Sequence, residues 1–189
     1  MPLDFCHPRA PHKKLRIPEW YVSSLMLDRA LDAIVIATVS SAVKGNSAHT
    51  AGANHVIDYK RENVGERVKA LTGNRGVDAV IEVDLAANAG LLPDVLAPNG
   101  IVAVYGSSAS ELPIPFQFLL QNSITLKFFL VYEMAKDMRA RATAELTAML
   151  ARDELIHQVA QAFELDQIVA AHEAVESGAA VGNVVLRIG

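Results

Sequence analysis

The sequence has a single cysteine, Cys6, which excludes an internal disulfide. It also lacks a long hydrophobic run: the longest apolar stretches, residues 33–39 and 126–132, have the length of strands, whereas a membrane span needs ~20 residues. No segment has the pattern of a secretory signal peptide with a small-residue cleavage site. We therefore expect no membrane partner and a location in the reducing cytoplasm.

A basic stripe of the kind that contacts nucleic acid is missing as well. The chain carries 17 Lys and Arg against 21 Asp and Glu, a net charge of −4, and the bases are scattered among acids except in the first sixteen residues. We therefore expect no nucleic-acid partner. The 189 residues, 51% of them hydrophobic, leave room for one globular domain with one core.

Residues 1–18 combine four prolines with the basic cluster His12, Lys13, Lys14 and Arg16 and show no apolar periodicity. This pattern predicts a loosely ordered leader. The apolar positions of residues 19–31 permit a helix.

From residue 33 onward, strand-like and helix-like segments alternate. Residues 33–39 form a continuous β-branched run, typical of a strand covered on both faces in the middle of a parallel sheet. Further strands are expected at 55–58, 77–83 and 101–105, and the helices between them at 41–51, 63–71 and 86–96. Gly45 and Asn46 predict a short or frayed first helix. This order predicts an α/β fold with a Rossmann-like, doubly wound parallel sheet.

The pattern changes after Gly106. A short helix is expected at 116–120, a strand at 123–132, a long helix at 133–152, and a strand, helix and strand at 157–165, 166–177 and 183–188. We therefore divide the chain into the leader, a nucleotide-binding domain over 19–152 and a C-terminal segment over 153–189.

Ligands of a doubly wound sheet bind beyond the carboxyl ends of its strands. The end of the strand at 33–39 has serines where an NAD site commonly has a carboxylate. Ser40, Ser41, Lys44 and Arg61 instead suit the 2′-phosphate of NADP, because hydroxyls and cations bind phosphate. The alternative, that Lys44 and Arg61 are ordinary solvated charges, stays open.

Several ordered motifs resemble the medium-chain dehydrogenase/reductase superfamily, and within it the zinc-independent quinone oxidoreductase, or zeta-crystallin-like, branch. The resemblance covers roughly residues 27–189. The motifs are IVIATVSS at 34–41, GANHVIDY at 52–59, GVDAVIEV at 76–83, and AHEAVESG at 171–178 followed by GNVVL at 182–186.

The resemblance implies an NADPH-binding Rossmann domain and reduction of a small-molecule quinone or activated enone. It also implies a homodimer formed by edge strands, here the strand at 123–132. By position, Lys44 and Tyr59 match residues that hold the adenosine phosphate, and the loops at 83–85 and 105–107 match those that flank the nicotinamide half. Since the cofactor performs the hydride chemistry, no catalytic side chain is assigned. The expected cofactor-binding residues are Ser40, Ser41, Lys44, Tyr59, Arg61, Val83, Asp84, Tyr105, Gly106 and Ser107.

The sequence departs from this family in two ways. Family members carry an N-terminal barrel-like catalytic domain, which we expect to be missing here, and no G-x-G-x-x-G or A-x-x-G-x-x-G turn occurs in the 189 residues. We therefore expect an N-terminally truncated fold without its first strand and glycine-rich turn. The flank of the strand at 33–39 would then be covered by the leader or another chain. The alternative function is a non-catalytic module, derived from that family, that dimerises or binds nucleotide.

Other chemistry has weaker support. Cys6, His7 and His12 have metal-ligating side chains, but one thiol in a leader makes a zinc site improbable, so no metal site is predicted. The segment at Ser107 lacks the second glycine of a nucleophile elbow, which argues against a hydrolase.

Overall fold

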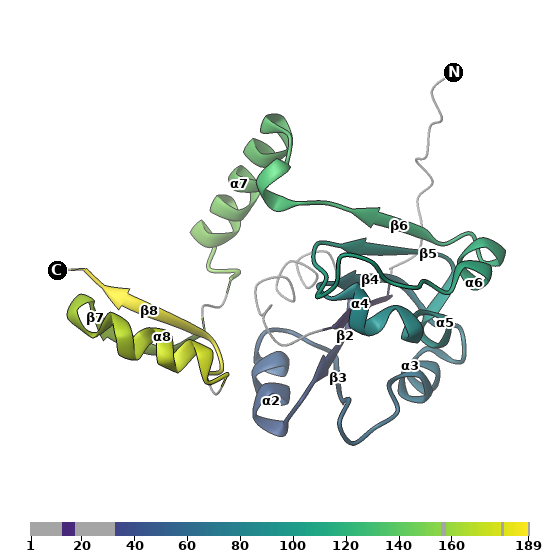
Figure 1. The fold of residues 1–189 in the computed structure, drawn as a ribbon, viewed down its shortest axis with the longest axis horizontal. Coiled ribbons are helices and arrows are strands. Elements are labelled where there is room, and N and C mark those ends of the chain that lie inside the picture. The colour runs from purple at the N-terminus through teal and green to yellow at the C-terminus, as the bar shows by residue number, and fades with distance from the viewer. Residues whose placement is uncertain (1–12, 18–32, 156–157, 179, 189) are drawn as a thin grey trace.

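A computed structural model of the chain describes residues 13–17, 33–155, 158–178 and 180–188 (Figure 1). The expected helix at 19–31 and most of the leader lie outside the described residues. No helix in the described ranges is both long and apolar enough to cross a bilayer.

The main sheet has six parallel strands in the order β3-β2-β1-β4-β5-β6. This arrangement confirms the predicted doubly wound α/β fold. The order reverses between β1 and β4, the position where ligands of such sheets bind. The strands are β1 (Lys13–Ile17), β2 (Ile34–Val39), β3 (His55–Asp58), β4 (Val77–Glu82), β5 (Leu96–Val104) and β6 (Thr125–Phe128).

The first strand is present, although the sequence analysis expects it to be missing. Lys13–Ile17 runs between β2 and β4, with Leu15 in register with both Ile36 and Val80. The expectation of a loosely ordered leader therefore fails for these five residues. They escaped recognition because three of them are Lys or Arg, whereas a central parallel strand usually reads as an apolar run. Residues 13–17 of the leader pair with β2 and so cover its flank, which is one of the two arrangements expected from the sequence.

Helices cover both faces of the main sheet. On one face, Ala48 of α2 (Ala42–Thr50) belongs to the same buried cluster as Val35, Ala37 and Val39 of β2. The other face buries Ile36 and Val80 with the remaining helices of this half. These are α3 (Val64–Thr72), α4 (Leu85–Asn88) and α5 (Leu92–Val95), with a 3₁₀ turn at Ala89–Leu91 between the last two.

Local details differ from the sequence predictions. α2 is continuous despite its glycine. Gly45 is buried, and a Cβ there would lie 3.3 Å from Val56 Cγ1, so the glycine lets the helix approach the sheet closely. The single helix expected at 86–96 is divided by the 3₁₀ turn, and β5 already begins at Leu96. The strand expected at 123–132 is limited to β6, and a 3₁₀ turn follows at Val131–Glu133.

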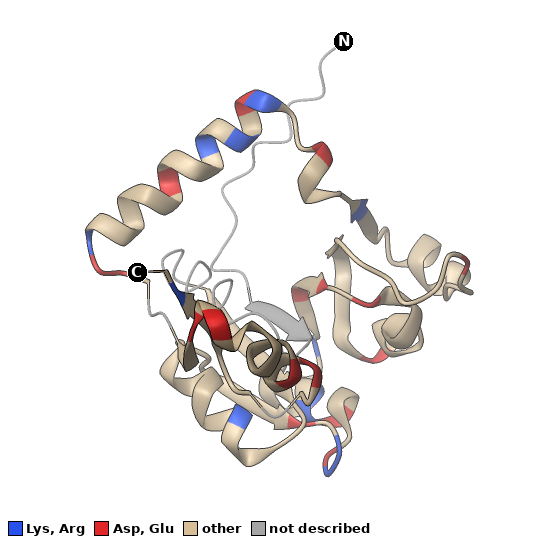
Figure 2. Ribbon diagram, turned by 60° about the vertical axis from the view of Figure 1, so that its left-hand side comes forward, with Lys and Arg blue, Asp and Glu red and all other residues tan. Residues whose placement is uncertain are grey.

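The chain then leaves the main sheet (Figure 1). After α6 (Phe116–Gln121) and β6 come α7 (Lys136–Ala151) and a βαβ unit of β7 (Val159–Glu164), α8 (Ile168–Glu176) and β8 (Asn183–Arg187). β7 and β8 form a separate two-stranded parallel sheet. Figure 2 shows both signs of charge along α7, and no basic stripe forms there. The domain division at residue 152 stays a prediction.

Candidate functional site

The predicted site residues lie at the carboxyl edge of the main sheet, on both sides of β1. Ser40, Ser41 and Lys44 follow β2, and Tyr59 and Arg61 follow β3; we call these five the β2–β3 group. Val83 and Asp84 follow β4, and Tyr105, Gly106 and Ser107 follow β5; these are the β4–β5 group. The sheet therefore gathers the ten residues into two groups that flank the switch point between β1 and β4.

The β2–β3 group is built around the start of α2. The hydroxyl of Ser41 caps this helix and accepts a hydrogen bond from the N–H of Lys44 at 3.4 Å. The N–H of Tyr59 donates to the carbonyl of Val39 at 3.1 Å, which holds the residue after β3 beside the end of β2. The first turn of α2 contains no acidic residue. A helix N-terminus of this kind favours an anion, because its N–H groups and dipole are positive.

Arg61 lies on the outer side of the β2–β3 group. Its Nε is 3.7 Å from Oδ2 of Asp58, and the side chain is 80% exposed. Asp58 Oδ1 also accepts the N–H of Lys60 at 3.1 Å. The ion pair is weak, because the separation is long and the guanidinium is solvated.

Asp84 organises the β4–β5 group. Its Oδ1 accepts hydrogen bonds from both the N–H and the hydroxyl of Ser108, each at 2.9 Å. The N–H of Ser108 is the main cause that lowers the pKa of Asp84 below its ordinary value. The carboxylate thus ties the loop after β4 to the loop after β5.

The backbone of the two loops is also closely packed. The N–H of Tyr105 donates to the carbonyl of Glu82 at 3.1 Å, and that of Leu85 to the carbonyl of Gly106 at 3.5 Å. A Cβ on Gly106 would lie 2.2 Å from the carbonyl oxygen of Val83, far inside contact distance. Gly106 is therefore required by the close approach of the two loops rather than by an unusual backbone angle.

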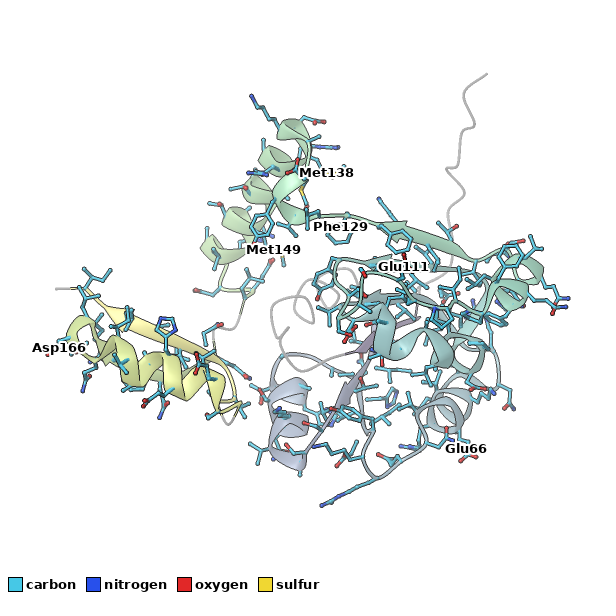
Figure 3. All side chains as sticks on the ribbon, viewed as in Figure 1. Glu66, Glu111, Phe129, Met138, Met149 and Asp166 are labelled. Atoms are coloured by element: carbon cyan, nitrogen blue, oxygen red, sulfur yellow. The ribbon has the colours of Figure 1, made fainter. Side chains whose placement is uncertain are left out.

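Tyr105 contacts the segment that follows the edge strand. Its ring centroid is 5.7 Å from that of Phe129, with the planes tilted by 32°. The N–H of Phe129 donates to the carbonyl of Val104 at 3.0 Å. Figure 3 shows Phe129 where the chain passes from β6 toward α7, so the β4–β5 group is linked to the sheet edge.

Sequence reasoning assigned no role in this site to three of its contributors: Glu82, Ser108 and Phe129. Glu82 had a signal, since an acid inside the otherwise apolar end of the 77–83 run needs a structural reason. Ser108 had none beyond following Ser107, because its contact with Asp84 joins residues 24 positions apart. The contact between Phe129 and Tyr105 likewise depends on how β6 lies beside β5.

Across the described part of the chain, no three His, Cys, Asp or Glu side chains come close enough to hold a metal ion. Cys6, His7 and His12 lie outside the described residues. The hydroxyl of Ser107 donates to the carbonyl of Ala109 at 2.8 Å.

The family model for zinc-binding dehydrogenases matches residues 24–148. The chain belongs to this family. Its relatives confirm the predicted place in the medium-chain dehydrogenase/reductase superfamily, in the quinone oxidoreductase branch.

Two curated relatives illustrate the similarity of this zinc-binding dehydrogenase family member to reductases. The chain is 27% identical over 164 residues to a 2-haloacrylate reductase from Burkholderia, covering 84% of the chain and 49% of the relative. It is 30% identical over 164 residues to quinone oxidoreductase 1 of Escherichia coli, covering 84% and 50%. The chain thus spans about half the length of the curated relatives it matches.

A solved structure shares the fold. The crystal structure of Escherichia coli quinone oxidoreductase complexed with NADPH superimposes with a TM-score of 0.78 at 26% identity, covering 94% of the chain and 58% of that structure.

Proposed function

We propose that the protein is an NADPH-dependent oxidoreductase that transfers hydride from NADPH to a small-molecule quinone or activated enone. The observation that carries the proposal is the pair of residue groups on either side of β1 at the carboxyl edge of the sheet. Two separated groups suit a dinucleotide, because its adenosine and nicotinamide halves lie on opposite sides of the switch point.

The β2–β3 group fits the phosphorylated adenosine. Ser40, Ser41, Lys44 and Tyr59 would hold the 2′-phosphate at the start of α2, with Arg61 at the outer side. The absence of an acid in the first turn of α2 supports a phosphate there, because a carboxylate would repel it. These residues favour NADPH over NADH.

The β4–β5 group would flank the nicotinamide half. The loop at Val83 and Asp84 and the loop at Tyr105, Gly106 and Ser107 are held to each other by the contacts of Asp84 and Gly106. NADPH supplies the hydride when it is bound, and the protein's part is to orient the ring and the acceptor. The relatives named quinone oxidoreductase and 2-haloacrylate reductase support an electron-poor acceptor.

The second candidate is a non-catalytic module that dimerises or binds a nucleotide. The observation in its favour is the sequence itself, which lacks the glycine-rich turn that lets pyrophosphate approach backbone N–H groups. The segment after β1, where that turn would lie, is outside the described residues.

NADPH binding followed by turnover separates the two candidates. An enzyme should melt at a higher temperature with NADPH, since a ligand at 100 times its Kd stabilises by ~2.7 kcal/mol, and should oxidise NADPH when a quinone is added. A melting shift without oxidation of NADPH by quinones or enones would favour the module. No shift at millimolar NADPH would rule out the enzyme.

We also propose a homodimer formed through the sheet edge. β6 is the outermost strand beside β5, and its free edge leads into exposed apolar side chains at Phe128, Phe129 and Leu130. An exposed apolar edge strand is a site for pairing with another strand, and two copies can pair symmetrically.

A further inference from the structure

Glu82, the last residue of β4, is the one fully buried acid among the described residues, with 0% of its surface exposed. Its Oε1 accepts hydrogen bonds from the N–H of Asp84 at 2.7 Å and from Nδ2 of Asn88 at 3.1 Å. Its Oε2 is buried and has no hydrogen-bond partner within the described ranges. None of the ion pairs formed by Lys and Arg within residues 33–155, 158–178 and 180–188 involves it.

An ionised carboxylate in these surroundings would be strongly disfavoured, because one of its oxygens is shielded from solvent and accepts no hydrogen bond from the described residues. A proton on Oε2 removes the charge and leaves Oε1 free to accept from Asp84 and Asn88. Burial is accordingly the main cause that raises the pKa of Glu82, and the N–H donors offset it only in part.

On one flank of Glu82, β1 places the apolar Ile17 in register beside it. Within residues 33–155, the groups that face Glu82 offer no compensating cation. The β4–α4 connection contributes Asp84, whose negative charge also raises the pKa of Glu82. α4 contributes the neutral amide of Asn88, and β5 places the apolar Val104 in register beside Glu82.

The two acceptor bonds of Glu82 set the course of the loop after β4. Asp84, whose N–H it binds, in turn binds Ser108 on the loop after β5. A chain of hydrogen bonds from Asn88 through Glu82 and Asp84 to Ser108 therefore holds both loops of the β4–β5 group in place.

We propose that Glu82 is a positioning residue of the nucleotide site, which holds both loops of the β4–β5 group in the arrangement that receives the cofactor. The inference rests on the proposed function. Glu82 acts as a neutral acid without touching the cofactor itself. Ionisation would drive the side chain to seek water and release Asp84, so cofactor affinity falls as pH rises through the ionisation of Glu82.

The test compares NADP⁺ binding by calorimetry, between pH 5 and pH 9, for the wild type, Glu82→Gln, Glu82→Leu and the control Glu66→Gln on α3 (Figure 3). Glutamine keeps the acceptor oxygen but cannot ionise, whereas leucine removes the acceptor. The ratio of the wild-type Kd to the Glu82→Gln Kd removes the titration of the cofactor's own phosphate, which both share.

We expect Glu82→Gln to bind within about threefold of the wild type at pH 5, and the ratio to rise about tenfold or more toward pH 9, as one pKa unit of coupling requires. Glu82→Leu should bind about tenfold more weakly at every pH, and Glu66→Gln should follow the wild type. If Glu82→Leu does not fold, the Glu82→Gln profile decides alone.

Two results would overturn the role of Glu82 while leaving the proposed function intact. One is a wild-type profile parallel to that of Glu82→Gln at all pH values; the other is a loss of affinity in Glu82→Gln at pH 5 as large as that expected of Glu82→Leu. Absence of NADP⁺ and NADPH binding to the wild type would instead overturn the proposed function, and this inference with it.

Discussion

Ser108 donates two hydrogen bonds, from its backbone N–H and from its hydroxyl, to the same carboxylate oxygen of Asp84, each at 2.9 Å. The two residues are 24 positions apart and lie on loops that follow different strands. Their contact makes the two loops one unit, so a change in either loop is transmitted to the other side of the β4–β5 group.

Replacing Asp84 by asparagine should lower stability in a pH-dependent way. The pKa of Asp84 is lowered in the fold, so this carboxylate stabilises the protein above the ordinary aspartate pKa of ~3.9 and loses that contribution as pH falls through the folded value. Loss of the charge should cost about 1 kcal/mol at pH 7. Urea unfolding of both proteins at pH 7 and near pH 3 checks this, and a difference that grows toward acid pH would contradict it.

Replacing Gly106 by alanine should force the two loops apart. The added Cβ would lie 2.2 Å from the carbonyl oxygen of Val83, so the backbone must shift, at a cost of about 2 kcal/mol. The matched control is Gly90→Ala, since nothing lies within 4 Å of a Cβ there. Thermal melting should show a loss for Gly106→Ala and little change for Gly90→Ala; equal melting temperatures would refute the close approach of the loops.

Replacing Lys44 by glutamate should weaken NADPH more than NADH. The new carboxylate would stand in the first turn of α2 and repel the 2′-phosphate that only NADPH carries. Fluorescence titration should show a loss of about tenfold or more for NADPH and a smaller one for NADH. Equal losses for the two cofactors would show that the phosphate is not bound at this position.

Replacing Phe129 by lysine should disrupt the proposed homodimer. Phe129 follows the edge strand and is 38% exposed, so a charge there would be buried against the second copy. Sedimentation at tens of micromolar protein should give a dimer for the wild type and a monomer or aggregates for the variant. Val169→Lys on α8, a more exposed apolar position, serves as the control and should stay dimeric. A monomeric wild type would exclude the edge pairing.

The strands of the main sheet that are rich in apolar residues were predictable from the sequence. β3 occurs at the predicted residues, and α3 lies within one residue of the helix expected at 63–71, with the side chain of Asn63 capping it by accepting from the N–H of Glu66. β1 was missed because strand pairing is made by the backbone, which its lysines and arginine do not prevent. Its neighbours β2 and β4 supply the hydrogen bonds from both sides.

The sequence could predict which strand ends carry the candidate site residues, but not the contacts that these residues make. The rule that ligands bind beyond the carboxyl ends of parallel strands selected residues that the structure gathers along one edge of the main sheet. It could not reveal that Asp84 is bound by Ser108 or that Glu82 is buried with one oxygen unpartnered, because both facts depend on distances between loops.

If the two residue groups together hold one dinucleotide, an NADPH titration followed by amide chemical shifts should perturb both groups at once. We expect saturable shifts at Ser41, Lys44 and Tyr59 and at Asp84, Gly106 and Ser107, with a single Kd. Shifts confined to one group, or absent from both at millimolar NADPH, would contradict it.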